Sequence, residues 1–434
     1  MENHDRAARV ICVIFLCRKE TMFRGVNLFR RIQSKRGLLS AGMFFIIFVF
    51  MGLLVWRMKT QTYVYQRFNT ETTSYIKGTV TEILEENSEV SGAAAEYAAG
   101  YQKVQVRLSE GNHKGEILEI ENYITAQHLV KVTKGSRVVV CADEPEQAEP
   151  YYTIYNYDRS SGIWLIAATF LLLVVLIGKK RGLMSCIGLV FTILMVAGYL
   201  LPGLYEGQNG FLLTVITVTA SCAVTCFCIG GLQKKTLLNL ISAVLGGVSA
   251  GVVYRIFMAI LHITGCNLDA AEDLVLIAQA TGLRLGDVLL SGVMVSALGA
   301  VMDVAVSMGA SLGEISGLNP EMGRTELFRS GMNIGRDMIG TMTNTLILAF
   351  AGSSLATLMV LISYGVQYNQ LMSSNFLTLE AAQGIAGSMA VVLTVPISAA
   401  VCAVGYGHLN KGSEKTEPEK EHAFKQAGQK GEIV

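Results

Sequence analysis

The chain has 434 residues, of which 51% are hydrophobic and only 16% are charged, and its formal net charge is +1. A water-soluble domain of this size would not normally carry so apolar a composition, so we predict a membrane protein in contact with a lipid bilayer. The balanced charge offers no basic surface for nucleic acid, and we expect no nucleic-acid partner.

The chain begins with a basic segment, residues 1–37, which we expect to be cytoplasmic. Its apolar run "ARVICVIFLC" is too short to cross a bilayer and no small-residue cleavage site follows it, so we do not expect a signal peptide. Translation from Met22 would leave residues 1–21 outside the working protein. The first membrane span is predicted at residues 38–56.

Residues 57–160 have a different character, because short β-rich runs alternate with turn-forming stretches. Five strands are predicted, in the runs "YIKGTVTEIL", "KVQVRL", "GEILEI", "SRVVVC" and "YYTIY". A short helix-compatible stretch, "TAQHLVKV", follows the third run. Five strands with a helix between the third and the fourth indicate a small OB-like domain, which we expect outside the cytoplasm with a protein as its partner.

Seven further stretches are long and apolar enough to cross a bilayer. They lie at residues 162–178, 182–200, 211–232, 236–262, 285–310, 338–364 and 381–406. The fold class is therefore mainly α, an eight-helix transmembrane bundle with the β-rich domain between helices 1 and 2. Lysine and arginine concentrate in alternate loops, which places both termini in the cytoplasm. Residues 161–408 would form the transmembrane domain with helices 2–8, and the lysine- and glutamate-rich tail, residues 409–434, is expected to be disordered.

One face of the predicted helix around residue 303 is small and polar. Asp303, Ser307, Ser311 and Glu314 follow one another at spacings of four, four and three residues, so they share one side of a helix. A carboxylate in a membrane span costs about 2.5–3.5 kcal/mol on insertion scales. Asp303 therefore needs a partner, a proton or a cation.

The next span carries a matching polar arc. Its members are Asn333, Asp337, Thr341, Asn344 and Thr345. Counting from the inner boundary at about 1.5 Å per residue places Asp303 and Asn344 at similar depths, so we expect them to meet. The connection "GLNPEMGRTELFRSG" between the two spans has the pattern of a short helix lying in the cytoplasmic interface.

Other interpretations of these residues remain open. Asp303 could be a protonated clamp bonded to Asn344, or it could pair with Arg336. The two membrane aspartates could belong to an intramembrane aspartyl protease, although the flanking residues Met302 and Arg336 do not fit the local sequences of such proteases. The chain has neither a phosphate-binding GxxxxGK loop nor a HExxH motif, and we expect no enzyme activity and no cofactor.

A cluster of cysteines in the fourth span could be imagined as a soft-metal site. Its members are Cys222, Cys226 and Cys228. Cysteine packs in helices as a small apolar residue, so we favour packing and expect no metal.

Two long motifs resemble a known family. "ALGAVMDVAVSMGASLGEI" followed by "LFRSGMNIGRDMIGTMTNTLILAFAGSSL" is similar to the signature of the YibE/F family of bacterial polytopic membrane proteins. The similarity extends from about residue 75 to about residue 406. It implies a bacterial plasma membrane, eight helices and an extracytoplasmic domain after the first, with no assigned activity. Ala356 and Gln383 depart from the proline and arginine of the family pattern, so a role for a basic residue in the final span does not carry over to this chain, whereas the motifs around Asp303 and Asn344 are intact.

We therefore expect a secondary transporter or exporter of an unknown small substrate or ion, coupled to a proton or a cation that binds Asp303. Neutral oxygens would come from Ser307, Thr341, Asn344 and Thr345, and the cytoplasmic gate would consist of Arg336, Asp337 and Glu314. The alternative is a non-transporting membrane scaffold or assembly factor whose outer β domain binds a partner.

Overall fold

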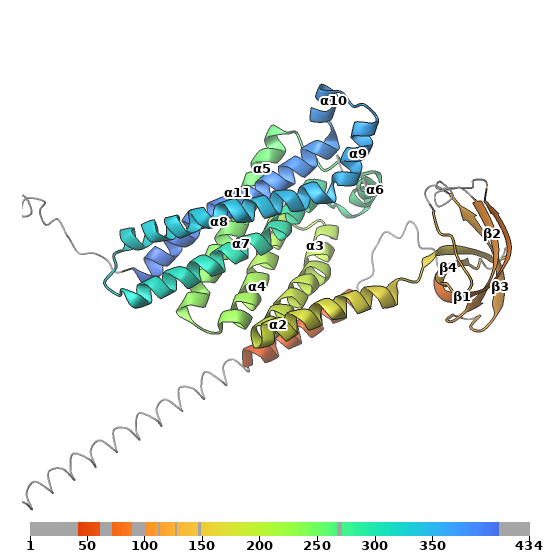
Figure 1. Ribbon diagram of the computed structural model, residues 1–434, viewed down its shortest axis with the longest axis horizontal. Helices are drawn as coiled ribbons and strands as arrows, with labels where there is room; N and C mark the ends of the chain where they lie inside the picture. Colours follow the sequence, from red (N-terminus) through yellow and green to blue (C-terminus); the bar gives the residue numbers. More distant parts are fainter. Residues whose placement is uncertain are drawn as a thin grey trace, which may run out of the picture. The chain divides into compact units, whose positions relative to one another are not determined.

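The structure is a computed structural model that describes residues 42–60, 72–88, 100–111, 113–125, 128–145, 149–266 and 271–407. The basic segment 1–37 and the tail 409–434, both predicted above from the sequence, lie entirely outside these ranges. The chain divides into two compact units, Tyr63–Gly182 and the combination of Met1–Thr62 with Leu183–Val434. Figure 1 shows their elements.

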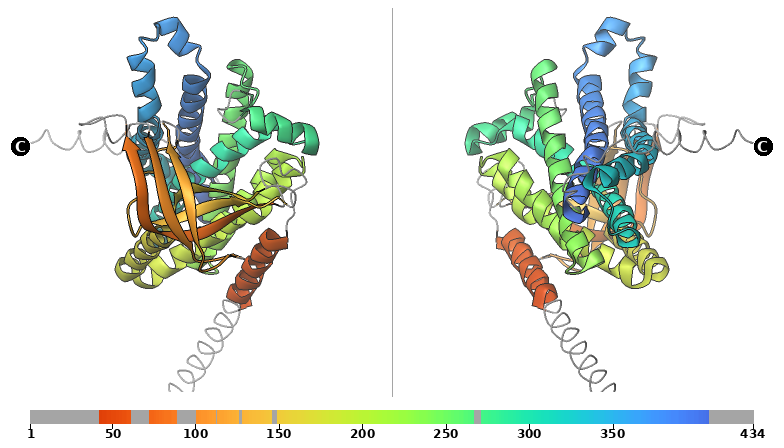
Figure 2. Two further views of the ribbon diagram at one scale, coloured as in Figure 1. Left: turned by 90° about the vertical axis from the view of Figure 1, so that its right-hand side faces the viewer. Right: turned by 90° about the vertical axis from the view of Figure 1, so that its left-hand side faces the viewer.

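The β unit is a curled antiparallel sheet of five strands in the order β3-β2-β1-β4-β5 (Figure 2). The strands are β1 (Thr73–Ser88), β2 (Gly100–Leu108), β3 (Ile117–Ile124), β4 (Arg137–Asp143) and β5 (Tyr151–Tyr157). Two register shifts in β1, between Val80 and Glu82 and between Ile83 and Glu85, increase the local twist that curls the sheet. The five predicted strands are confirmed, and Val104, Val106 and Leu108, which alternate with polar residues in β2, all point into the core.

The helix expected in "TAQHLVKV" is wrong for the part that the structure describes, because residues 129–133 are extended without regular secondary structure. The buried side chain of Gln102 holds this segment: its Nε2 donates to the carbonyl oxygen of Val132 at 3.1 Å, and its Oε1 accepts from the Val132 N–H at 3.0 Å. Asn122 Nδ2 donates to the Val130 carbonyl oxygen at 2.7 Å. Side chains of the sheet thus replace the hydrogen bonds that a helix would have made.

The junction between β5 and the following helix, α2 (Ser160–Met195), is fixed by Asp158. Its Oδ1 accepts hydrogen bonds from the hydroxyl and the backbone N–H of Ser160, at 2.5 and 3.0 Å. Lys77 Nζ lies 3.8 Å from Oδ2. The Ser160 hydroxyl, the Ser160 N–H and the Lys77 ammonium hold the pKa of this carboxyl below its ordinary value of 3.8.

The Asp158→Asn substitution is expected to lower the melting temperature in a pH-dependent way. Because the folded pKa is the lower one, the carboxylate stabilises the fold fully above its ordinary pKa, and this contribution is lost as the pH falls through the folded pKa. The difference in melting temperature between wild type and variant should therefore be constant between about pH 6 and 7 and shrink below about pH 4. A difference that stays the same down to about pH 3 would contradict this role.

The helical unit consists of long helices joined by short connections. After a first helix, Gly42–Thr60, and the second part of α2 come η2 (Val196–Leu200), α3 (Leu201–Tyr205), α4 (Gly210–Gly230), α5 (Lys234–Ile260), α6 (Ala271–Thr281), α7 (Leu285–Leu318), α8 (Arg324–Ser353), α9 (Leu355–Ser363), α10 (Tyr368–Met372) and α11 (Asn375–Tyr406). Within the described ranges, six helices are long and apolar enough to cross a membrane, or up to seven if the bent pair α8 and α9 is one span.

The predicted count of eight spans is not confirmed, and two segments account for the difference. Ser160–Tyr205 is a single apolar segment of 46 residues, but Lys179 has the non-helical angles φ 49° and ψ −130°, so the helix is kinked there. The predicted span 338–364 is broken by a 55° bend between α8 and α9. The hydroxyls of Ser353 and Ser354 both donate to the Phe350 carbonyl oxygen, a pattern that bends helices.

The separate interfacial helix expected between the sixth and seventh predicted spans is wrong. Residues 319–323 form a short turn, and α8 runs from Arg324 into the polar segment without interruption. The side chain of Leu327, expected at a membrane surface, is fully buried. It belongs to a core cluster that it shares with Met308 and Leu312 of α7 and Cys402 of α11.

The core of the helical unit lies where α5, α7 and α11 cross. Small residues line the crossing, among them Ala250, Ala297, Ala390 and Gly246, and they allow the backbones to approach closely. A Cβ atom added at Gly246 would meet Thr394 of α11 and Val301 of α7. The tight packing fixes how each of these helices is turned about its own axis, and hence which faces remain outside.

Candidate functional site

The polar side of α7 lies opposite its packed side. Val301, Val304, Ala305 and Met308 are buried against neighbouring helices, whereas Asp303 and Ser307 between them are exposed. The exposed positions are Gly292, Ser296, Gly299, Asp303, Ser307, Glu314 and Gly317, and Ser311 is half-buried. The sequence therefore predicted correctly that Asp303, Ser307 and Glu314 share one face.

The polar side of α8 is arranged in the same way. Gly331 and Gly335 let this helix pack closely on Ala399 and Val395 of α11. On the exposed side lie Asn333, Arg336, Asp337, Gly340, Thr341, Asn344 and Thr345. We call the exposed residues named for α7 and α8 the polar face.

The hydrogen bonds of the polar face stay within each helix. Thr345 Oγ1 donates to the Thr341 carbonyl oxygen at 2.9 Å, and Thr341 Oγ1 donates to that of Met338 at 3.1 Å. Arg336 Nη1 donates to Asn333 Oδ1 at 3.4 Å. The hydroxyls are thus satisfied locally and their oxygens retain lone pairs for another donor or a cation.

The structure does not bring Asp303 and Asn344 together. Neither side chain has a hydrogen bond or an ion pair with any residue of the described ranges. Asp303 precedes the end of α7 at Leu318 by about 22 Å along the helix axis, whereas Asn344 lies about 30 Å beyond the start of α8 at Arg324. By this count Gly340 is the residue of the polar face closest to the level of Asp303, and Asn344 lies about 8 Å beyond that level along α8.

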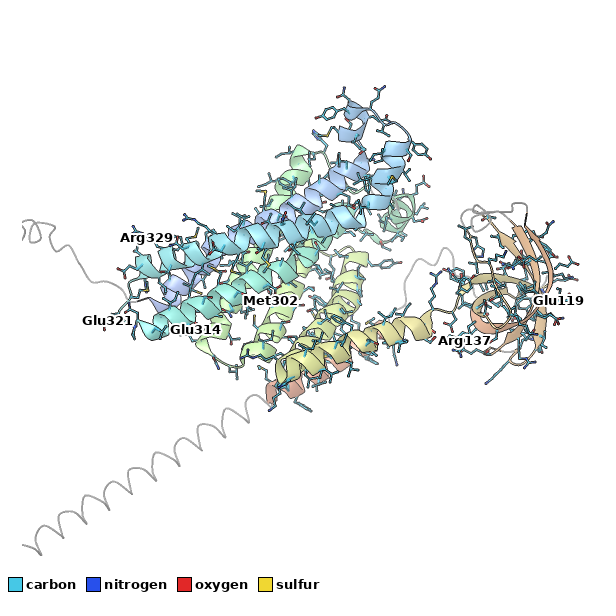
Figure 3. All side chains as sticks on the ribbon, in the orientation of Figure 1. Glu119, Arg137, Met302, Glu314, Glu321 and Arg329 are labelled. Carbon is cyan, nitrogen blue, oxygen red and sulfur yellow. The ribbon has the colours of Figure 1, made fainter. Side chains whose placement is uncertain are left out.

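The predicted gate residues are spread along the hairpin formed by α7 and α8. Glu314 lies near the end of α7, at the same end of the hairpin as Glu321 and Arg329, whereas Met302, the neighbour of Asp303, lies near the middle of α7 (Figure 3). Arg336 and Asp337 are exposed on α8 and form no ion pair with Asp303 or Glu314 within the described ranges. The clamp and the Arg336 pair considered for Asp303 are therefore not formed in this structure.

No three histidine, cysteine, aspartate or glutamate side chains of the described residues lie together as metal ligands. Cys222, Cys226 and Cys228 are buried, and the side chains of Cys222 and Cys228 pack in separate apolar clusters.

A cavity lined by an acidic residue of α11 was not predicted from the sequence. Glu380 of α11 lines a cavity between α11 and the bent pair α8 and α9, and its Oε2 is buried without a hydrogen-bond partner. A sequence signal for it exists, because Glu380 is the only aspartate, glutamate, lysine or arginine between Asp337 and Lys411. It was overlooked because the predicted span began one residue later.

Long apolar helices with small-residue crossings and a polar face define the class of protein as a multi-pass membrane protein. The family model described as YibE/F-like protein matches residues 166–408. The match covers more than half of the chain, so the chain belongs to the YibE/F-like family, and the predicted resemblance is confirmed for this region. No curated protein and no solved structure matches the chain.

Proposed function

We propose that this protein is a secondary transporter or exporter of the bacterial plasma membrane, coupled to a proton or a cation, and that the polar face of α7 and α8 lines its transport path. The observation that carries this proposal is Asp303, a carboxylate near the middle of a 34-residue apolar helix, exposed and unpaired within the described ranges. Intramembrane acids of this kind mark ion and substrate pathways by default.

Lipid is an unfavourable neighbour for this face. A single aspartate at the centre of a span costs about 2.5–3.5 kcal/mol on insertion scales, and Asp337 and Arg336 add further charges along the same hairpin. Water or another protein surface must therefore cover the face in the membrane. Both alternatives suit a transport path, because such paths are lined by water or lie at a contact between helices that move.

The polar residues lie at different levels along α7 and α8, which supports successive binding positions along a transport path. Asp303 would carry the coupling proton or cation, with Ser307 and Thr341 as its nearest neutral oxygens. Asn344 and Thr345, about 8 Å further along α8, would form the next position. Arg336, Asp337 and Glu314 would then act as the cytoplasmic gate.

Eight spans with both termini in the cytoplasm fit this proposal. A helix of 46 residues would be about 69 Å long, more than twice the hydrocarbon thickness of about 30 Å, so the segment Ser160–Tyr205 has the length of two spans. Its kink lies at Lys179, next to Lys180 and Arg181, and such basic clusters favour the cytoplasmic side. The β unit would then lie outside the cytoplasm. Its five-stranded curled sheet fits the OB-like class.

The Asp303→Asn substitution tests the proposal. In proteoliposomes with an internal pH-sensitive dye, the wild-type protein should dissipate an imposed pH gradient when candidate cations and solutes are added. The variant should fall to the level of protein-free liposomes, because an amide binds no proton. Glu321→Gln, an equal loss of charge in the exposed turn of the same hairpin, should behave like the wild type. Equal flux through wild type and Asp303→Asn would remove Asp303 from the mechanism.

A scaffold or assembly factor is the second candidate function, and a groove on the β unit favours it. The groove, of about 380 Å³, lies beside the two edge strands, with Tyr123 of β3 and Tyr151 and Tyr155 of β5 in its wall. Exposed tyrosines of this kind are common where proteins bind partners. If this is the function, substitutions of Tyr123 and Tyr155 should abolish partner binding, and Asp303→Asn should leave every flux unchanged.

A further inference from the structure

The cavity beside Glu380 combines apolar walls with one unpaired charge. Its volume is about 280 Å³, and its walls include Ile347 and Phe350 of α8 and Phe376 and Leu377 of α11. The polar groups in the wall are Ser354 and Glu380. Because the Ser354 hydroxyl already donates to the Phe350 carbonyl oxygen, Glu380 is left as the group that can select a ligand.

The cavity follows from the bend in the chain. α8 packs on α11 as far as its end at Ser353, and α9 then turns away by 55°. Figure 1 shows α9 turning away from the line of α8 beside the beginning of α11. Two straight helices would have closed this space with side chains, whereas the bend leaves it open next to the second turn of α11.

Glu380 is half-buried, and one oxygen of its carboxylate is unsatisfied in the structure. Its Oε2 is buried without any hydrogen-bond partner, and the side chain forms no ion pair within the described ranges. The part of α8 after Arg336 contains no lysine or arginine, and neither do α9, α10 and α11, so these helices offer no cation to neutralise Glu380. Because a buried carboxylate oxygen without a partner is costly, a cation from outside these helices is the natural complement.

We infer that this cavity binds an organic ammonium ion with an apolar body, the ammonium group on Glu380 and the body between Phe350 and Phe376. An ammonium ion would form a charge-assisted hydrogen bond to the free oxygen, and the two aromatic rings add favourable surfaces for a cation and its hydrocarbon. A metal ion is a poorer occupant, since one carboxylate among apolar groups offers too few oxygen ligands. This inference does not rest on the proposed transport, because binding here needs neither Asp303 nor any flux.

The ammonium group could belong to a free amine or to an aminolipid headgroup. α11 is about 48 Å long, which exceeds the hydrocarbon thickness of about 30 Å, so the helix is long enough for an end of it to reach the level of lipid headgroups. Both sources present the same chemistry to Glu380.

The test uses two probes of the same shape, naphthylmethylamine and naphthylmethanol, which differ in whether they carry a positive charge. Binding to the full-length protein in a neutral maltoside detergent is followed by naphthyl fluorescence. The wild type should bind the amine about tenfold or more tightly than the alcohol, the range of a charge-assisted hydrogen bond. Glu380→Gln should remove this preference, and Glu272→Gln, the same change at an exposed position of α6, should keep it.

A second variant locates the body of the ligand. A Cβ atom at Gly384 would lie 3.5 Å from the Phe350 ring, an ordinary contact, so Gly384→Leu should fill the cavity while the protein still folds. This variant should weaken both probes equally. Displacement of the amine by phosphatidylethanolamine, but not by phosphatidylglycerol, would support an aminolipid, and displacement by neither would support a free amine. Equal affinity of wild type for the two probes, or a preference that survives Glu380→Gln, would overturn the inference.

Discussion

The Gly246→Leu substitution is expected to prevent the helical unit from forming its native packing. Gly246 lies at the crossing of α5, α7 and α11, where a Cβ atom would meet the Thr394 hydroxyl and lie 2.7 Å from Cγ1 of Val301. Thr394 cannot rotate away freely, since its hydroxyl donates to the Ala390 carbonyl oxygen at 2.6 Å. The whole leucine side chain would have to displace two helices that belong to the same core.

The expected destabilisation exceeds the usual cost of overpacking, which is about 1–3 kcal/mol, because the added side chain meets buried residues of both α7 and α11. Thermal unfolding in detergent, followed by the exposure of buried cysteines such as Cys222 and Cys402, measures it. Gly299→Leu is the matched control, because Gly299 lies in α7 with no atom within 4 Å of an added Cβ. If the two variants have the same melting temperature, the close helix crossing does not determine stability.

Hydropathy and periodicity predicted much of this fold because both report on burial. The long apolar runs became helices, and spacings of three and four residues correctly placed Asp303, Ser307 and Glu314 on one face. Alternation in "KVQVRL" likewise predicted which side chains of β2 are buried. These patterns arise from residues a few positions apart, so they can be read directly from the sequence.

Features that depend on contacts between distant segments were missed. The break at Ser354 lies within a uniformly apolar run, where only the paired hydroxyls of Ser353 and Ser354 distinguish it. Helix periodicity predicted which face of α7 carries Asp303. It could not predict what packs against that face, because this depends on the position of another segment. The turn at residues 319–323 sets the register of α7 and α8, and this register likewise depends on contacts that periodicity does not report.

The stretch "TAQHLVKV" shows how a distant contact overrides a local preference. Its described part is held extended by the side chains of Gln102 and Asn122, which reach it from β2 and β3. Lys131 adds an ion pair of 2.6 Å with Glu86, and its carbonyl oxygen accepts a hydrogen bond from the Tyr157 hydroxyl. These partners lie on four strands, β1, β2, β3 and β5, and they come together only once the sheet has formed.

The Gln102→Ala substitution is therefore expected to release this segment. It would leave the N–H and the carbonyl oxygen of Val132 unpaired inside the unit, where Val132 is fully buried, and it would take a partner from Asn122. Each buried group left unsatisfied costs about 1–3 kcal/mol, so the loss should be about 3 kcal/mol or more. Hydrogen exchange of the full-length protein, read by mass spectrometry, should show fast exchange of the Val132 amide.

The control lies on the same strand. Gln105 is an outward-facing residue of β2 whose side chain contacts no part of this segment, so Gln105→Ala changes the same chemistry on the opposite face. It should leave the exchange of Val132 unchanged. If Gln102→Ala also leaves it unchanged, the remaining contacts of Lys131 and Asn122 hold the segment by themselves. The extended conformation would then arise from the closure of the sheet around it, with the amide of Gln102 filling a position that the backbone had already fixed.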